Sequence, residues 1–194
     1  MDRVKSLIMA VASLLVVGCN STKSDLVSPD GRTALHFTLT DAGEAAYSLT
    51  FDGEELVPLS RLGITTTDSN FCEGLTLVDI GHSSFDETWE PVWGQFAEIR
   101  NHYNSLTATL KNADGKALKI EMRLFDDGLG LRYTLEGEGT ASITSERTEF
   151  RMGGDYESHW IAGSDDDAEF DYVHSLLSEI TPATMQQSAG RVRG

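Results

Sequence analysis

The sequence predicts an all-β domain of antiparallel strands, on three observations. From residue 27 to about residue 150 the dominant hydrophobic period is two residues, the period of a strand with one buried face. Turn residues, with Asp-Gly pairs among them, separate these segments at spacings of about 8–12 residues. No segment before residue 165 carries an apolar stripe with the period of a helix. Together these features indicate an antiparallel sandwich or barrel.

The first expected strands alternate apolar and polar side chains. Residues 35–39 place Leu, Phe and Leu at every second position, and residues 47–51 do the same with Tyr, Leu and Phe. Asp52-Gly53 follows as a hairpin turn. Residues 75–80 continue the pattern less cleanly, and we expect a strand there as well.

A second hairpin is expected further along the chain. Apolar residues alternate over residues 106–110 and again over residues 118–124, and the Asn-Ala-Asp-Gly sequence at residues 112–115 lies between them. Asp126-Asp127-Gly128 then predicts another turn, and residues 129–135 predict another strand.

The first nineteen residues predict a lipoprotein-type signal peptide with a lipobox. Two basic residues precede an apolar segment at residues 7–17, which is shorter than the roughly 20 residues that cross a bilayer. Gly18-Cys19 ends this segment, so we expect lipidation at Cys19, and the alternative is an ordinary secretory signal. Residues 20–26 are interpreted as a polar tether. The protein is then exported, to the bacterial periplasm or outer membrane, and contacts the membrane through its lipid anchor alone.

Charge and cysteine content narrow the classes of partner. A formal net charge of -16 disfavours nucleic acid and anionic membrane surfaces, and it suits a cation or a neutral polar ligand such as a sugar. The chain has 2 cysteines. If Cys19 carries lipid, only Cys72 remains, and we expect it to be a buried small apolar side chain.

One stretch, residues 86–106, concentrates aromatic and polar side chains and is the candidate interface or substrate site. Trp89 and Trp93 lie four positions apart, which puts them on one face of a strand. One interpretation makes both tryptophans core residues. The other makes them a platform for a sugar ring, with hydrogen bonds from Arg100, Asn101 and Asn104.

The segment after residue 150 is acidic. Residues 155–179 contain eight Asp and Glu and no Lys or Arg. Three consecutive aspartates at residues 165–167 resemble the start of a calcium loop, but Leu176 stands where an EF-hand needs Glu, so we exclude an EF-hand. A solvated loop is the simplest interpretation of this run.

Four motifs carry a resemblance to a known family. They are SPDGR at residues 28–32, FDETWEPVWGQ at residues 85–95, IRNHYN at residues 99–104 and RLFDDGLGLRY at residues 123–133. Their order and spacing resemble the N-terminal domain of glycoside hydrolase family 97, over roughly residues 26–181. Members of this family are exported or lipid-anchored bacterial enzymes that act on α-glucosides or α-galactosides.

The resemblance implies a β-super-sandwich of the galactose-mutarotase type, followed in the family by a catalytic (β/α)8 barrel and a C-terminal β domain. Such a barrel takes about 250 residues, and only about forty follow the last clear strand here. We therefore expect residues 27–194 to be a C-terminally truncated, incomplete sandwich. It would have no catalytic residue and be inert without the barrel domain, its natural partner.

The resemblance also implies a cofactor and a ligand. Family members bind calcium, and the N-terminal domain contributes one glutamate, a role that falls on Glu169. A single carboxylate cannot supply the six to eight oxygens that calcium takes, so binding by this chain alone is expected to be weak. The expected function is a carbohydrate-binding or scaffold domain of a calcium-dependent α-glycosidase acting on α-linked oligosaccharides. The alternative is a stand-alone carbohydrate-binding or structural surface lipoprotein.

Overall fold

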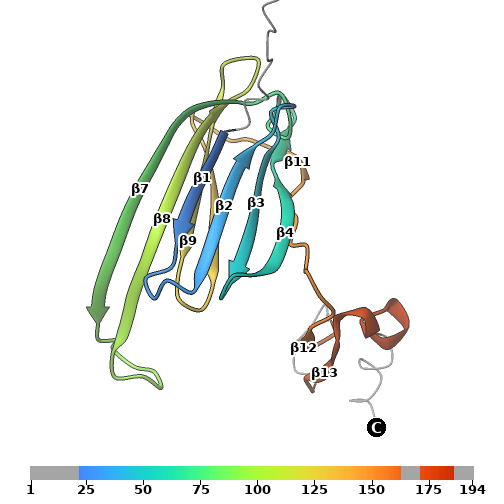
Figure 1. The fold of residues 1–194 in the computed structure, drawn as a ribbon. Helices are drawn as coiled ribbons and strands as arrows, with labels where there is room; N and C mark the ends of the chain where they lie inside the picture. The colour runs from blue at the N-terminus through green and yellow to red at the C-terminus, as the bar shows by residue number, and fades with distance from the viewer. Residues whose placement is uncertain (1–21, 163–170, 186–194) are drawn as a thin grey trace, which may run out of the picture.

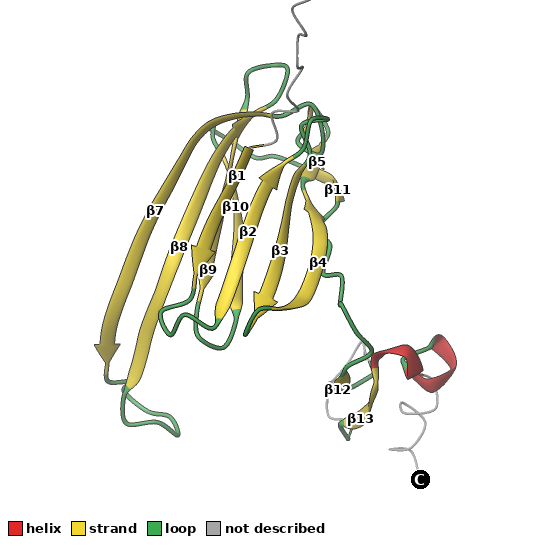
Figure 2. Ribbon diagram, in the orientation of Figure 1, coloured by secondary structure: helices red, strands yellow, loops and turns green. Residues whose placement is uncertain are grey.

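The structure, a computed structural model, describes residues 22–162 and 171–185, and these fold mainly into antiparallel β-strands (Figure 1). The elements are β1 (Thr22–Val27), β2 (Thr33–Leu39), β3 (Ala45–Phe51), β4 (Glu54–Leu62), β5 (Ile64–Thr66), β6 (Ser69–Asn70), β7 (Thr76–Trp89), β8 (Ile99–Lys111), β9 (Ala117–Leu124), β10 (Leu129–Leu135), β11 (Ile143–Glu146), β12 (Glu157–Trp160), β13 (Val173–Leu176) and the 3-10 helix η1 (Leu177–Glu179). Within the described part of the chain, helix appears only after β13 (Figure 2). The all-β prediction is confirmed.

The first sheet has the strand order β1-β2-β3-β4, with every neighbouring pair antiparallel. Its buried positions alternate along β2, as the sequence predicted. The β3–β4 turn uses Asp52 and Gly53, whose φ angles are 50° and 84°. Positive φ at both central residues is the requirement of a type I′ turn, which explains why Asp-Gly occurs there.

The second sheet has the order β10-β9-β8-β7, again antiparallel throughout. The predicted β8–β9 hairpin is confirmed. The Asn112 side chain closes its turn by accepting hydrogen bonds from the backbone N–H groups of Asp114, at 3.1 Å, and Lys116, at 2.9 Å. Gly115 takes a φ of 77° in this turn, a conformation that favours glycine.

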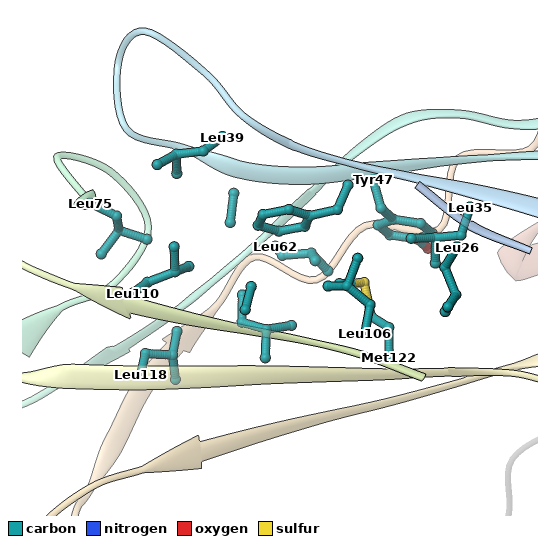
Figure 3. Packing of buried hydrophobic residues seen from close by; sticks show 14 of the residues in the cluster. Leu26, Leu35, Leu39, Tyr47, Leu62, Leu75, Leu106, Leu110, Leu118 and Met122 are labelled. Atoms are coloured by element: carbon teal, nitrogen blue, oxygen red, sulfur yellow. The ribbon is translucent and has the colours of Figure 1, made fainter. Parts of the chain in front are cut away.

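The hydrophobic core lies between the two sheets (Figure 3). Both sheets contribute fully buried side chains, among them Leu35, Phe37, Tyr47, Leu62, Leu106, Leu110, Leu118, Ile120 and Met122. Each such side chain stabilises the fold by about 1.5–3 kcal/mol relative to an exposed position. Cys72 is buried, as the sequence predicted.

An irregular segment after β11 covers the free edge of β4. The Arg147 N–H donates to the Gly63 carbonyl at 2.8 Å, and the Glu149 N–H donates to the Arg61 carbonyl at 2.9 Å. The Tyr47 hydroxyl donates to the Glu149 carbonyl at 3.0 Å. Backbone pairing of this kind protects an edge strand from pairing with another molecule.

The folded part of the chain begins earlier than we expected from the sequence. Residues 20–26 were expected to be a tether, yet Thr22–Val27 form β1, which pairs antiparallel with β2, and Leu26 packs into the core. The physical reason is that ladder hydrogen bonds use backbone groups, so polar side chains on a solvated face do not prevent pairing. The expected signal peptide, including Cys19, lies outside the described residues. None of the helices in the described ranges is long and apolar enough to cross a bilayer.

Candidate functional site

The β7–β8 hairpin extends beyond the rest of its sheet (Figure 1). β9 pairs with β8 only from Asn104 to Lys111, whereas β7 pairs with β8 over its whole length, from Ile99 onward. Residues 85–103, which include the turn, therefore stand clear of the second sheet as a two-stranded ribbon. We call this segment the projecting hairpin.

A stack of side chains supports the base of the projecting hairpin. The Phe85 and Tyr103 rings lie 5.4 Å apart, and the Phe125 ring lies 5.1 Å from Tyr103. The Arg123 guanidinium lies 4.8 Å from the Tyr103 ring centroid, and its Nε donates to the Glu121 carboxylate at 2.8 Å. We call Phe85, Tyr103, Arg123 and Phe125 the aromatic stack. Paired rings and a cation over a ring each add about 0.5–1.5 kcal/mol beyond burial, so the stack holds the hairpin in one orientation.

The aromatic stack brings together three of the four sequence motifs, and the fourth motif, SPDGR, also reaches the base of the projecting hairpin. The Asp30 N–H donates to the Asp126 carboxylate at 2.8 Å, which joins SPDGR to RLFDDGLGLRY. The Asn104 side-chain amide donates to the Val27 carbonyl at 2.8 Å, which joins IRNHYN to the end of β1. The four motifs are thus one contiguous structure around the hairpin base, a relation that their sequence spacing alone did not reveal.

The tip of the projecting hairpin is apolar and exposed. Trp89 is 48% exposed, Val92 99%, Trp93 88% and Phe96 62%. We call these four residues the aromatic tip. The core interpretation of the two tryptophans is wrong, because Trp89 ends β7 beyond the neighbouring strands and Trp93 lies in the turn, where nothing in the described structure covers them.

The five predicted site residues do not form a single cluster. Side chains of directly paired residues share a face, so Trp89 and Asn101 lie on the outer face of the hairpin with the aromatic stack. Arg100 and Asn104 lie on the inner face, toward β1. Two bonds, at 2.8 and 2.7 Å, join the Arg100 guanidinium to the Asp86 carboxylate. These hydrogen bonds lower the pKa of Asp86 and raise the pKa of Arg100.

A polar cavity of about 410 Å³ lies elsewhere, among the β5–β6 turn, the β8–β9 turn and the β10–β11 connection. Lys116 Nζ bonds the Asp68 carboxylate at 2.6 Å in its wall. Sequence analysis did not identify this cavity. The sequence feature that could have indicated the cavity is the pair Gly137 and Gly139. Their φ angles of 143° and 96° shape the β10–β11 connection that lines it.

The expected calcium ligand, Glu169, lies outside the described residues. Across residues 22–162 and 171–185, no group of three or more His, Cys, Asp or Glu side chains is arranged to hold a metal ion.

Comparison with known proteins decides the family. The family model for the glycosyl-hydrolase 97 N-terminal domain matches residues 26–192. The chain belongs to this family. The resemblance of the four motifs is thereby confirmed, and the motifs that meet at the hairpin base lie within the matched family domain.

The most informative relatives are whole enzymes of which this chain resembles a part. A retaining alpha-galactosidase of Bacteroides thetaiotaomicron is 26% identical over 160 residues, which cover 80% of this chain and 23% of the relative. A glycoside hydrolase family 97 enzyme from Pseudoalteromonas sp. strain K8, solved in complex with panose, has a TM-score of 0.71 at 22% identity. That match covers 80% of this chain and 25% of the enzyme. A beta-arabinopyranosidase has a TM-score of 0.67 at 23% identity, over 73% of this chain and 23% of its own. The structural matches show a shared β-sandwich fold, and the chain spans about a quarter of the length of these relatives.

Proposed function

We propose that this chain is the N-terminal carbohydrate-binding and scaffold domain of a calcium-dependent α-glycosidase, an α-glucosidase or α-galactosidase acting on oligosaccharides. The observation that carries the proposal is the aromatic tip, held out from a family domain by the aromatic stack. A rigid ribbon that ends in exposed aromatic side chains suits contact with another surface, because aromatic anchors dominate binding energy at interfaces.

The partner that we propose for the aromatic tip is the catalytic domain. The match covers only 23–25% of the length of the relatives, so this domain accompanies a much larger partner in them. Isolated exposed apolar residues need no explanation, but four of them within eight positions form a patch of the kind that marks interaction sites. The inner face adds the Asp86–Arg100 pair as a polar rim.

The direct sugar contact that we propose uses the same aromatic side chains, so a sugar and the catalytic domain compete for the aromatic tip. Trp93 presents most of its ring to solvent, and such a ring is an apolar surface on which a sugar can stack. The Pseudoalteromonas enzyme binds panose and, in another structure, acarbose. We extend this class of ligand, α-linked oligosaccharides, to the present chain as part of the proposal.

We further propose that residues 1–194 do not hydrolyse glycosides by themselves. A glycosidase needs a carboxylic acid with a raised pKa opposite a second carboxylate. Among the described carboxyl groups, those with a displaced pKa are all displaced downward, for example Asp86 by Arg100 and Glu149 by Arg61. These carboxylates are ion-pair partners and are poorly suited to donate a proton to a leaving group.

Calcium dependence and lipid anchoring are also parts of the proposal. Glu169 supplies one carboxylate oxygen ligand, and the catalytic domain supplies the others, in agreement with the acidic character of residues 155–179. Cys19 carries the lipid that holds the exported protein at the membrane surface. Chelation of calcium is then expected to reduce glycosidase activity in the assembled enzyme, and a Glu169→Gln exchange there is expected to raise the calcium concentration needed to restore it.

One experiment separates this function from the alternative of a stand-alone sugar-binding lipoprotein. The chain has 3 tryptophans, so Trp160→Phe leaves only the two in the aromatic tip as fluorophores. This variant is titrated with maltooligosaccharides, and separately with the catalytic domain of the Bacteroides relative. Saturable binding of the catalytic domain, weakened by about 30-fold in Trp93→Ala, supports the scaffold role. Sugar quenching without domain binding supports the alternative, and the absence of both contradicts the proposal.

A further inference from the structure

The polar cavity of about 410 Å³ lies at the end of the sandwich opposite the aromatic tip. Its walls are residues 66–69, Phe71, Lys116 and residues 135–142, and we call it the turn cavity. The β5–β6 turn in its wall and the tip of the projecting hairpin lie at opposite ends of the structure (Figure 2). β7, whose 14 residues span about 45 Å, runs between these ends. The turn cavity is therefore separate from the surface that we propose for the catalytic domain.

A charged pair in the wall presents a hydrogen-bond donor beside an acceptor. Lys116 Nζ donates to the Asp68 carboxylate at 2.6 Å, and the Thr66 hydroxyl donates to the same carboxylate at 2.8 Å. These two bonds lower the pKa of Asp68, so it is ionised at neutral pH. An ionised carboxylate has about four lone-pair positions and an ammonium has three N–H donors, so both groups retain bonding capacity for a ligand.

Hydroxyl groups line the rest of the turn cavity. Thr67, Thr140 and Ser142 lie in its wall, and the Thr67 N–H donates to the Ser142 carbonyl at 3.0 Å, which joins the two loops. Within residues 22–162 and 171–185, no hydrogen bond joins these three hydroxyls to another protein group. Phe71 and Leu135 add apolar surface. The wall thus combines polar groups that can bond a ligand with an apolar patch.

The charges of the wall select the class of ligand. Asp68, Glu136 and Glu138 outnumber Lys116, which disfavours an anion. Lys116 pairs with Asp68, and Lys119 pairs with Glu136, each at 2.6 Å, so these two carboxylates are already neutralised toward a cation. The described residues also contain no cluster suited to a metal ion. A neutral ligand with several hydroxyls remains, because each hydroxyl can both donate and accept.

We propose that the turn cavity binds a neutral sugar through two neighbouring hydroxyls of one ring. One hydroxyl donates to the Asp68 carboxylate, and the next accepts from Lys116 Nζ. Such charge-assisted bonds are stronger than bonds between neutral groups. The hydroxyls of Thr67, Thr140 and Ser142 bond the remaining polar groups of the sugar. The cavity volume of about 410 Å³ lies within the range of roughly 300–1,000 Å³ that is usual for small-molecule sites.

The location of the turn cavity gives it a use that the aromatic tip does not have. A sugar and the catalytic domain compete for the aromatic tip, whereas the turn cavity stays open to sugar when the catalytic domain is bound; this consequence rests on the proposed function. A long oligosaccharide held there raises the effective concentration of substrate near the enzyme. The turn cavity is then an additional substrate-holding site.

NMR titration of the isotope-labelled full chain with maltose tests the site. We expect saturable shifts of the amide resonances of residues 66–71, Lys116 and residues 135–142. Lys116→Met is expected to weaken binding by about tenfold and Asp68→Asn by about fivefold, because each removes a charge-assisted bond. Asp52→Asn is the matched control and is expected to stay within about twofold. Asp52 also bonds a basic side chain, Arg32, at 2.7 Å, but it precedes β4, whereas the turn cavity lies beyond the other end of that strand.

Two further variants and a second ligand separate this site from the aromatic tip and from a cation site. Trp93→Ala is expected to leave the maltose shifts of the turn cavity unchanged, so either sugar contact can fail without the other. Ala141→Phe adds a ring at a wall position and is expected to weaken maltose binding by about tenfold. Spermidine, a cation, is expected to cause no saturable shift at these residues. Circular dichroism verifies that each variant is folded.

Four results would each overturn the proposal. They are the absence of maltose shifts at the turn cavity, maltose affinity that Lys116→Met and Asp68→Asn both retain, saturable spermidine binding at these residues, and loss of the turn-cavity shifts in Trp93→Ala.

Discussion

Trp93→Ala tests the placement of the aromatic tip and its proposed role together. A fully buried tryptophan costs about 3–5 kcal/mol when it is truncated to alanine. Trp93 is 88% exposed, so folding buries only about 30 Å² of a side chain that buries up to about 250 Å² in a core. At about 25 cal/mol per Å² this area contributes below about 1 kcal/mol. We therefore expect the melting temperature to fall by no more than about 3 °C for a chain of this length.

Tyr103→Ala and Phe150→Ala are the matched comparisons. Tyr103, in the aromatic stack, is 8% exposed, so its truncation is expected to cost about 3 kcal/mol and to lower the melting temperature by about 9 °C. Phe150 is 64% exposed and follows Glu149, whose backbone bonds β4 in the first sheet. In the catalytic-domain titration, Trp93→Ala is expected to weaken binding by about 30-fold, equivalent to about 2 kcal/mol for an interface anchor, whereas Phe150→Ala is expected to leave it unchanged.

One result would contradict the exposed position of Trp93, and another would contradict its role in binding. A fall of about 10 °C in the melting temperature of Trp93→Ala, measured by circular dichroism, would mean that the tryptophan is buried and that the description of an exposed tip is wrong. An unchanged melting temperature together with unchanged binding would leave the fold intact and remove the aromatic tip from the interface.

Three other exchanges test the sandwich itself. Arg61 holds the pKa of Glu149 at about 2, below its usual value near 4.5, so this carboxylate stabilises the fold above about pH 4.5 and loses that effect as the pH falls toward 2. Glu149→Gln is expected to lower the neutral-pH melting temperature and flatten the acid limb of a pH series, and an identical acid limb would contradict the assignment. Gly63→Ala places a Cβ 2.7 Å from a backbone oxygen at a φ of 153° and is expected to lose about 1 kcal/mol or more in urea unfolding, whereas Gly81→Ala, with open space around it, serves as the neutral control. Tyr133→Phe removes the hydroxyl that accepts the Gly63 N–H at 3.1 Å and is expected to cost about 1–2 kcal/mol in the same assay, so unchanged unfolding would show that water replaces it.

The parts of the fold that the sequence predicted are those governed by local chemistry. Asp52-Gly53 and the turn at residues 112–115 were identified because few residues accept positive φ or close a turn with their own side chain. Alternation located β2, β3, β8, β9 and β10, since period two follows directly from strand geometry.

The features that the sequence did not predict depend on which other segments of the chain pack against or pair with a strand. Alternation identifies two faces of β7 but not whether anything covers either one, so Trp89 and Trp93 fitted the core as well as the surface. β1 was missed because its pairing with β2 uses backbone groups that carry no sequence signature. The meeting of the four motifs depends on pairing over long distances along the chain, as between Asp30 and Asp126.

The position of the aromatic stack makes the projecting hairpin adjustable. The stack lies on the outer face of the second sheet, whereas the sandwich core lies between the sheets, so the ribbon beyond the stack can change in length without altering the core. Inserting two residues in each strand of the ribbon lengthens it by about 7 Å and keeps every side chain on its original face. Inserting one residue in each strand turns the tip over. The distance between the sandwich and its partner can therefore be changed in steps of two residues per strand, while Tyr103 keeps the base of the hairpin in place.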